Sequence, residues 1–255
     1  MLKNSDELNG MREAGKLAAE VLEMITDYVR PGISTGELDE ICFKYITDVQ
    51  KAIPANVGYR GFKKTLCTSI NQVICHGIPD TNRILKSGDI MNIDVTVIKD
   101  GWHEDTSKMF LIGKAQSHNE RLVRVTQECL YKGIEAARPG ARLGDIGNAI
   151  QIHAEKNYYS VVEEYCGHGI GKIYHDEPQI LHYGEPNTGQ EIIEGMCFTI
   201  EPMINLGSKS TKLLADGWTV ETKDGKNSAQ WEHTIYIGKE GAEILTLRNE
   251  EKNFI

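Results

Sequence analysis

A short motif that occurs twice places the strongest constraint on how this chain folds. Residues 30–38 (RPGISTGEL) and 138–146 (RPGARLGDI) share Arg-Pro-Gly, a second glycine, an acidic residue and an aliphatic residue, at a separation of 108 positions. Each copy follows a helix-like stretch and opens another one. The motif therefore predicts that one arrangement of two helices around a sharp turn is built twice.

A second pair of matching segments supports an internal repeat. The dipeptides at 93–94 (ID) and 200–201 (IE) lie 107 positions apart, each inside an apolar, strand-like run. Two matches at nearly the same separation predict two similar α+β halves, roughly residues 1–110 and 111–255. Because no Pro- or Ser-rich linker divides the halves, we expect a single domain, residues 1–255, with a shared core.

The helices expected around the two motifs have recognisable ends. Apolar residues recur at three- and four-residue spacing from Met11 to Ile25 and predict the first helix. Residues 34–37 (STGE) resemble a capping box and predict a second helix that runs to about Val49. A third helix is expected to begin near the capping box at 117–120 (SHNE) and to continue to Ala137.

A hairpin brings two carboxylates together. Residues 90–98 alternate between apolar and polar side chains, as in a strand, and residues 100–101 (DG) are a strong hairpin turn. With a two-residue loop, Asp94 faces Ser107. Asp105 is then a diagonal neighbour of Asp94 on the same face, with Cβ atoms roughly 6–8 Å apart.

Composition excludes several classes of protein. The chain has 28 Lys and Arg against 37 Asp and Glu, for a net charge of −9, so neither nucleic acid nor an anionic membrane is an expected partner. No run approaches the roughly 20 apolar residues that span a bilayer, and the N-terminus lacks the apolar core of a secretion signal. The six cysteines form no C-x-x-C pair, which predicts reduced, mostly buried thiols and a cytoplasmic protein.

Carboxylates beside apolar strands suggest a metal site. Asp94 and Asp105 lie next to a core, where unpaired charge is unfavourable, and Glu201 and Glu232 form another acidic pair in the second half. Between them, glycines surround His168 and are expected to present it from a loop. Four carboxylates and one imidazole supply enough donors for two divalent ions about 3.5–4 Å apart, which would support hydrolysis of an amide or ester.

Taken together, six segments identify a family resemblance. The chain resembles the type I methionine aminopeptidases of bacterial type, without the N-terminal zinc-binding extension, over nearly its whole length. The segments that resemble family motifs, in the family's order, are 71–79 (NQVICHGIP), 92–95 (NIDV), 103–107 (HEDTS), 166–171 (CGHGIG), 199–203 (TIEPM) and 230–234 (QWEHT).

The resemblance implies a pita-bread α+β fold, with two pseudo-symmetric halves and a metal site between them. It implies removal of the initiator methionine from nascent chains whose second residue is small. Two ions (Co, Mn, Fe or Zn) would be held by Asp94, Asp105, His168, Glu201 and Glu232. His76 would contact the scissile amide, His175 the carbonyl, and Glu201 would also act as the acid or base.

Further positions follow from the same resemblance. The pocket for the methionine side chain would consist of Tyr59, Phe62, Cys67, Tyr174 and Trp218. A monovalent cation would lie at Asn71, Val73 and Ser228. Two positions depart from the family pattern, because Lys63 stands where Pro is frequent and Glu104 where Gly is common. These departures leave open the local loop shape and the substrate preference.

Two other functions remain as alternatives. An Xaa-Pro aminopeptidase or prolidase shares the fold and ligands, although such enzymes usually carry a long extra N-terminal domain. A catalytically silent, ribosome-associated binding protein would have lost ligands, whereas all five are present here. The expected partners are nascent chains that begin with Met, with a transient ribosome contact, and the expected oligomeric state is a monomer.

Overall fold

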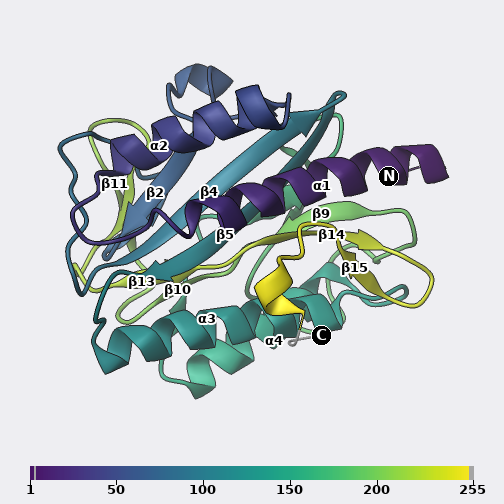
Figure 1. The fold of residues 1–255 in the computed structure, drawn as a ribbon. Coiled ribbons are helices and arrows are strands. Elements are labelled where there is room, and N and C mark those ends of the chain that lie inside the picture. Colours follow the sequence, from purple (N-terminus) through teal and green to yellow (C-terminus); the bar gives the residue numbers. More distant parts are fainter. Residues whose placement is uncertain (3, 253–255) are drawn as a thin grey trace.

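The structure is a computed structural model that describes residues 1–2 and 4–252 (Figure 1). The elements up to the end of the hairpin are α1 (Ser5–Ile25), α2 (Thr35–Lys44), a π-helical turn (Tyr45–Val49), β1 (Ile53–Pro54), a 3-10 turn (Tyr59–Gly61), β2 (Leu66–Ile70), β3 (Val73–Cys75), β4 (Ile90–Lys99) and β5 (Trp102–Leu111). The later elements are α3 (Ser117–Ala136), α4 (Leu143–Lys156), β6 (Ser160–Val161), β7 (Gly167–Gly169), β8 (Asp176–Ile180), β9 (Cys197–Ile200), β10 (Met203–Asn205), β11 (Thr211–Leu213), β12 (Val220–Thr222), β13 (Ser228–Gln230), β14 (His233–Ile237), β15 (Ala242–Ile244) and a 3-10 turn (Asn249–Glu251).

The predicted hairpin is present in the predicted register. β4 pairs antiparallel with β5, so that Asp94 lies opposite Ser107 and Thr96 opposite Asp105. Asp100 and Gly101 both have positive φ, 49° and 81°, as a two-residue hairpin turn requires. β4 also pairs with β1 and β2, which completes the sheet of the first half.

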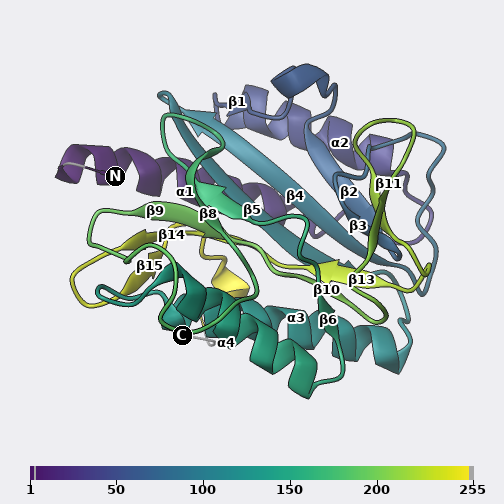
Figure 2. The same cartoon turned by 180° about the vertical axis from the view of Figure 1, so that it is seen from behind.

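Helices α1 and α2 cover one face of this sheet (Figure 1). The apolar face of α1 is buried against β4 and β5, and residues such as Leu22 and Ile25 are fully enclosed. The predicted capping box at Ser34 and Glu37 begins α2, and the helix continues as the π-helical turn to Val49. In Figure 2, which shows the molecule from behind, these two helices lie beyond the strands.

In the second half, α3 and α4 pack beside a five-stranded sheet of order β15-β14-β9-β7-β8. A separate core of apolar side chains joins these helices to the strands. The capping box predicted at Ser117 is wrong, because the residue that caps α3 is Gln116 and no side chain bonds to the helix terminus there. The backbone carbonyl of Gln116 accepts from the N–H groups of Asn119 and Glu120, at 2.9 and 3.0 Å, so α3 begins here without a side-chain cap.

The two copies of the repeated motif make equivalent backbone contacts. Gly32 N donates to Leu85 O, and Gly140 N donates to Ile192 O, each at 2.9 Å. Both glycines have positive φ, which a glycine adopts without strain. We therefore propose that residues 1–110 and 111–255 are structurally similar halves of one domain.

Strands from the two halves also pair directly. β3 of the first half pairs with β12 of the second, and an isolated bridge joins Ser107 to Glu232. All six cysteines are free, as predicted. Among the described helices, none has the length and apolar character needed to cross a bilayer.

Candidate metal and substrate site

A cavity of about 320 Å³ lies where the two halves meet. The residues predicted to bind metal, to act in catalysis or to hold methionine all line it. They are Tyr59, Phe62, Cys67, His76, Asp94, Asp105, His168, Tyr174, His175, Glu201, Trp218 and Glu232. The structure therefore brings together positions that span most of the sequence.

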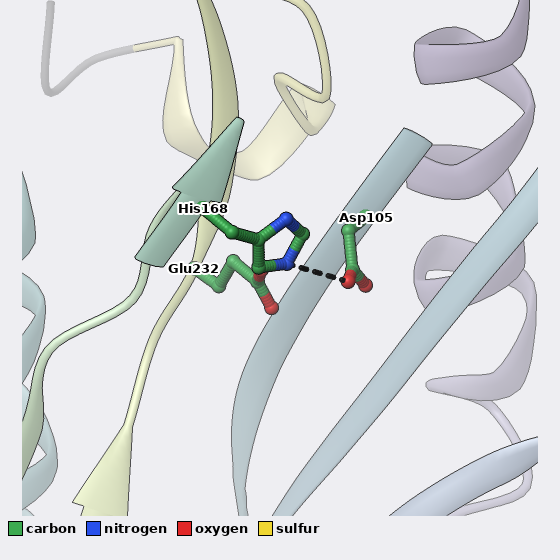
Figure 3. Close-up of side chains that lie close together, drawn as sticks. All are labelled: Asp105, His168 and Glu232. Atoms are coloured by element: carbon green, nitrogen blue, oxygen red, sulfur yellow. Dashed lines mark ion pairs between the residues drawn. The ribbon is translucent and has the colours of Figure 1, made fainter. Parts of the chain in front are cut away.

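Each acidic residue lies within a strand or directly beside one. Asp94 and Asp105 project from β4 and β5, Glu201 follows β9, and Glu232 lies between β13 and β14. Asp105, His168 and Glu232 each offer a ligand atom, and these atoms lie within 4.8 Å of one another (Figure 3). These three residues form a candidate cation site.

His168 lies in a strand rather than in the loop that the glycines predicted. β7 is only three residues long, and its neighbouring glycines allow it to pack closely between other strands. A Cβ at Gly167 would lie 2.3 Å from Thr199 O, and one at Gly169 would lie 2.2 Å from Glu177 O. His168 Nε2 is 3.7 Å from both Asp105 Oδ2 and Glu201 Oε1.

The buried carboxylates of the cavity lie close enough to repel one another. Burial, followed by the neighbouring carboxylates, raises the pKa of Asp94 and of Glu232 well above the usual range. Burial also raises the pKa of Glu201 to about 7, although His168 partly offsets this effect. Asp94 Oδ1 and Glu232 Oε1 are buried with no hydrogen-bond partner among the described residues.

These observations fit bound divalent cations. Carboxylate and imidazole donors suit Mn, Fe, Co or Zn, and a cation would satisfy the two unpartnered oxygens. It would also remove the repulsion among the carboxylates, since each acid would then be stabilised in its ionised form.

Burial favours the neutral form of the two other histidines that were predicted to contact substrate. Burial lowers the pKa of His76, and burial together with the nearby His168 lowers the pKa of His175 to about 4. His76 has a φ of 57°, an unusual value for a non-glycine residue that aims its ring between Tyr165 and Trp218. His175 Nδ1 lies 2.9 Å from the Tyr59 hydroxyl.

Aromatic rings form one wall of the cavity. The Phe62 and Trp218 rings meet edge to face with centroids 5.0 Å apart, and the Tyr59 and Tyr174 centroids are 4.8 Å apart. The Cys67 side chain is buried next to them. Such a slot is apolar and contains one polarizable sulfur.

Several contributors to the site were not predicted. Gln230 Nε2 donates to Glu201 Oε2 at 3.2 Å, and the Thr199 hydroxyl donates to Glu201 Oε1 at 2.8 Å. The buried His182 accepts a hydrogen bond from the Glu201 backbone N–H at 3.1 Å. Gln230 and Thr199 lie in segments that resemble family motifs, and this position is the signal that could have predicted them. Nothing local in the sequence marks His182.

The residues predicted for a monovalent cation lie outside the cavity lining. Ser228 N donates to Asn71 O at 2.9 Å, so these two residues are in contact. Val73 begins β3 and pairs with Glu221 of β12. Glu104, one of the two departures from the family pattern, lies within β5, where its side chain is fully buried.

Comparison with known proteins agrees with the fold. The model of metallopeptidase family M24 matches residues 9–239. The chain is 56% identical to the methionine aminopeptidase of Escherichia coli (strain K12) over 250 residues, which is 98% of this chain and 95% of that protein. The methionine aminopeptidase of Rickettsia prowazekii is 55% identical over 245 residues, 96% and 94% of the two chains.

Solved structures give the same result. The crystal structure of the Rickettsia prowazekii methionine aminopeptidase superposes with a TM-score of 0.95 at 54% identity, covering 97% of this chain and 99% of that one. Prolidase from Pyrococcus furiosus, at 20% identity, a TM-score of 0.75 and coverage of 97% and 66%, shares only the fold. The chain therefore belongs to metallopeptidase family M24 and has the pita-bread fold. Within that family its similarity to methionine aminopeptidases is high, and the predicted resemblance is confirmed.

Proposed function

We propose that this metallopeptidase removes the initiator methionine from nascent polypeptides whose second residue is small. The observation that carries the proposal is the placement of one acidic, cation-binding cavity directly beside an apolar aromatic slot. The slot would hold the methionine side chain, because an unbranched thioether packs well against aromatic rings. The first peptide bond would then lie over the carboxylates.

The ligands of two divalent ions would be Asp94, Asp105, His168, Glu201 and Glu232. When bound, such a pair lowers the pKa of water and polarises a carbonyl group. Glu201 would accept and return the proton of the attacking water. Co, Mn, Fe or Zn would suit these ligands, and we propose a monovalent cation at Asn71, Val73 and Ser228.

His76 and His175 would contact the peptide bond itself. His175 would donate a hydrogen bond to the carbonyl oxygen and to the negative charge that develops there. Its Nδ1 faces the Tyr59 hydroxyl, which fixes the ring orientation. His76 would contact the amide nitrogen, held in position by its unusual backbone conformation.

Steric exclusion would set the preference for a small second residue. That residue would lie against the rim formed by Tyr59 and His76, which both line the cavity. A hydrophobic pocket discriminates a methylene by only about 1–3 kcal/mol, so a sharp limit requires collision rather than weaker attraction. We further propose a cytoplasmic monomer that meets nascent chains through a transient ribosome contact.

A panel of peptides tests this function. Protein loaded with Mn²⁺ should release methionine from Met-Ala-Ser rapidly, from Met-Leu-Ser very slowly, and should leave Ala-Pro-Ser intact. Preferred cleavage of the Xaa-Pro bond would instead indicate a prolidase, an alternative that is supported by the shared fold alone. A metal-loaded protein that cleaves none of the peptides would indicate a binding protein.

A further inference from the structure

A fully buried cluster of ionisable side chains lies outside the cavity, where the C-terminal segment (residues 248–252) packs against β14. Arg248 and His233 are 0% exposed and Glu251 is 1% exposed. Arg248 Nε lies 2.7 Å from Glu251 Oε2, and His233 Nε2 lies 3.3 Å from the same oxygen. In Figure 1, the turn that bears Glu251 is the yellow helical turn above α3, from which Gln127 donates to Glu251 at 3.1 Å.

This cluster is not explained by stability alone. Burial of an ion pair removes both charges from water, and replacing such a pair by apolar side chains of similar size is often neutral or stabilising. Arg248 nevertheless uses each arm of its guanidinium group for a different partner. Nε faces Glu251, Nη2 lies 3.4 Å from His233 Nε2, and Nη1 donates to Thr106 Oγ1 at 2.7 Å.

Thr106 connects the cluster to the cavity. Its hydroxyl accepts from Arg248 and donates to the backbone carbonyl of Glu232 at 2.9 Å. Thr106 directly follows Asp105 in β5, and the Asp105 carbonyl accepts from the Thr234 hydroxyl at 2.8 Å. The backbone carbonyl of Glu232 is therefore hydrogen-bonded to β5, and the backbone carbonyl of Asp105 is hydrogen-bonded to β14.

The two faces of β5 contact different parts of the molecule. Successive side chains of a strand point to opposite faces, so Asp105 faces the cavity while Thr106 faces Arg248. A bridge of backbone hydrogen bonds joins Ser107 to Glu232 at 3.2 and 3.4 Å, and the Arg248–Thr106 contact reaches this junction from the C-terminal segment. The Arg248–Thr106 contact therefore supports the junction between Ser107 and Glu232 on the side away from the cavity.

We propose that Arg248, acting through Thr106, is a positioning residue that holds Asp105 and Glu232 at the separation needed to share divalent ions. The proposal rests on the cation site proposed above. It makes the C-terminal segment part of that site, although none of its residues lines the cavity. A lysine presents one compact charge and not a fork of donors. The variant Arg248→Lys should therefore not reproduce the contacts of the Arg248 guanidinium group.

Metal affinity tests the proposal on the full chain. Metal-free protein is titrated calorimetrically with Mn²⁺, and Mn²⁺ spin resonance reports whether two ions are coupled. Thr106→Val removes the hydroxyl at nearly constant volume, and Arg248→Lys removes the fork. Each should weaken Mn²⁺ binding by about 10–100-fold.

Two matched variants serve as controls. Thr106→Ser keeps the hydroxyl and should restore the affinity and the coupled signal. Arg12→Met removes an exposed arginine that pairs with Glu243, and it should bind Mn²⁺ as the unchanged protein does. If Arg248→Lys does not fold, the comparison of Thr106→Val with Thr106→Ser decides.

Equal Mn²⁺ affinity of folded Thr106→Val and Thr106→Ser would overturn the positioning role. If the unchanged protein binds Mn²⁺ while these two variants bind equally, the positioning proposal fails and the proposed function stands. If the unchanged protein itself binds no Mn²⁺, both proposals fail.

Discussion

In the first half of the chain both acidic residues of the cavity come from one hairpin, whereas in the second half the site residues come from separate strands. Asp94 and Asp105 are fixed by the register of β4 and β5. His168, Glu201 and Glu232 depend on how β7, β9 and the β13–β14 junction pack. The first half therefore positions its two acidic residues by local structure, and the second half positions its site residues by long-range packing.

The largest effect is expected at Glu201, in the half that depends on packing. Glu201→Gln keeps the shape of the side chain but removes its charge and basicity. The variant should stay folded and lose about 10³-fold or more in the rate of Met-Ala-Ser cleavage. Glu194→Gln, at an exposed position, is the control and should retain full activity. Substantial activity of metal-loaded Glu201→Gln would refute its role as proton acceptor.

His76 provides the next test, from the half that depends on local structure. Because His76 would contact substrate and not metal, His76→Ala should lower the catalytic rate by about 10²-fold or more while the bound metal stays constant. Metal analysis and peptide turnover on one sample measure both quantities, and His118→Ala on the exposed face of α3 is the control. A parallel fall in metal content would instead make His76 a ligand.

A glycine from each half sharpens the comparison directly. A Cβ at Gly169 would lie 2.2 Å from a backbone oxygen, whereas one at Gly101 would approach only the flexible end of Lys172, at 3.2 Å. Gly169→Ala should lower the free energy of unfolding by about 3 kcal/mol, because strands must separate. Gly101→Ala should cost about 1 kcal/mol, from its positive φ alone. Chemical denaturation measures both, and equal losses would show that the two halves tolerate change alike.

The smallest effect concerns Glu104, which lies in the hairpin but outside the cavity lining. Neither carboxylate oxygen has a hydrogen-bond partner within the described residues, and the Thr234 hydroxyl beside it donates to Asp105 O. Burial raises the pKa of Glu104 well above its usual 4.5. A raised pKa means that the folded state favours the protonated form, so stability is lost as the pH rises above 4.5.

Glu104→Gln removes this pH-dependent loss. The variant should gain about 1–2 kcal/mol over the unchanged protein at pH 8 and much less at pH 4.5. Denaturant unfolding of both metal-free proteins at the two pH values measures the difference. An equal gain in the free energy of unfolding at both pH values would show that ionisation of Glu104 does not destabilise the folded chain.

The same contrast between the halves explains what the sequence could predict. Alternation and an Asp-Gly turn define the hairpin, so the pairing of Asp94 with Ser107 followed from local rules. The contact of His182 with the Glu201 backbone depends on sheet packing and has no local pattern. His168 was expected in a loop, because glycines that permit close strand packing resemble glycines that permit turns. The resemblance to a family, and not periodicity, grouped the residues of the second half.

The central claim is that the two halves together hold a pair of divalent ions that the reaction requires. The most direct measurement is a titration of metal-free protein with Mn²⁺, with binding stoichiometry and Met-Ala-Ser turnover followed in the same samples. The account predicts two ions per chain, turnover that appears only as they bind, and loss of both in Asp105→Asn, which removes one shared ligand. Full turnover by chelated, metal-free protein would contradict it.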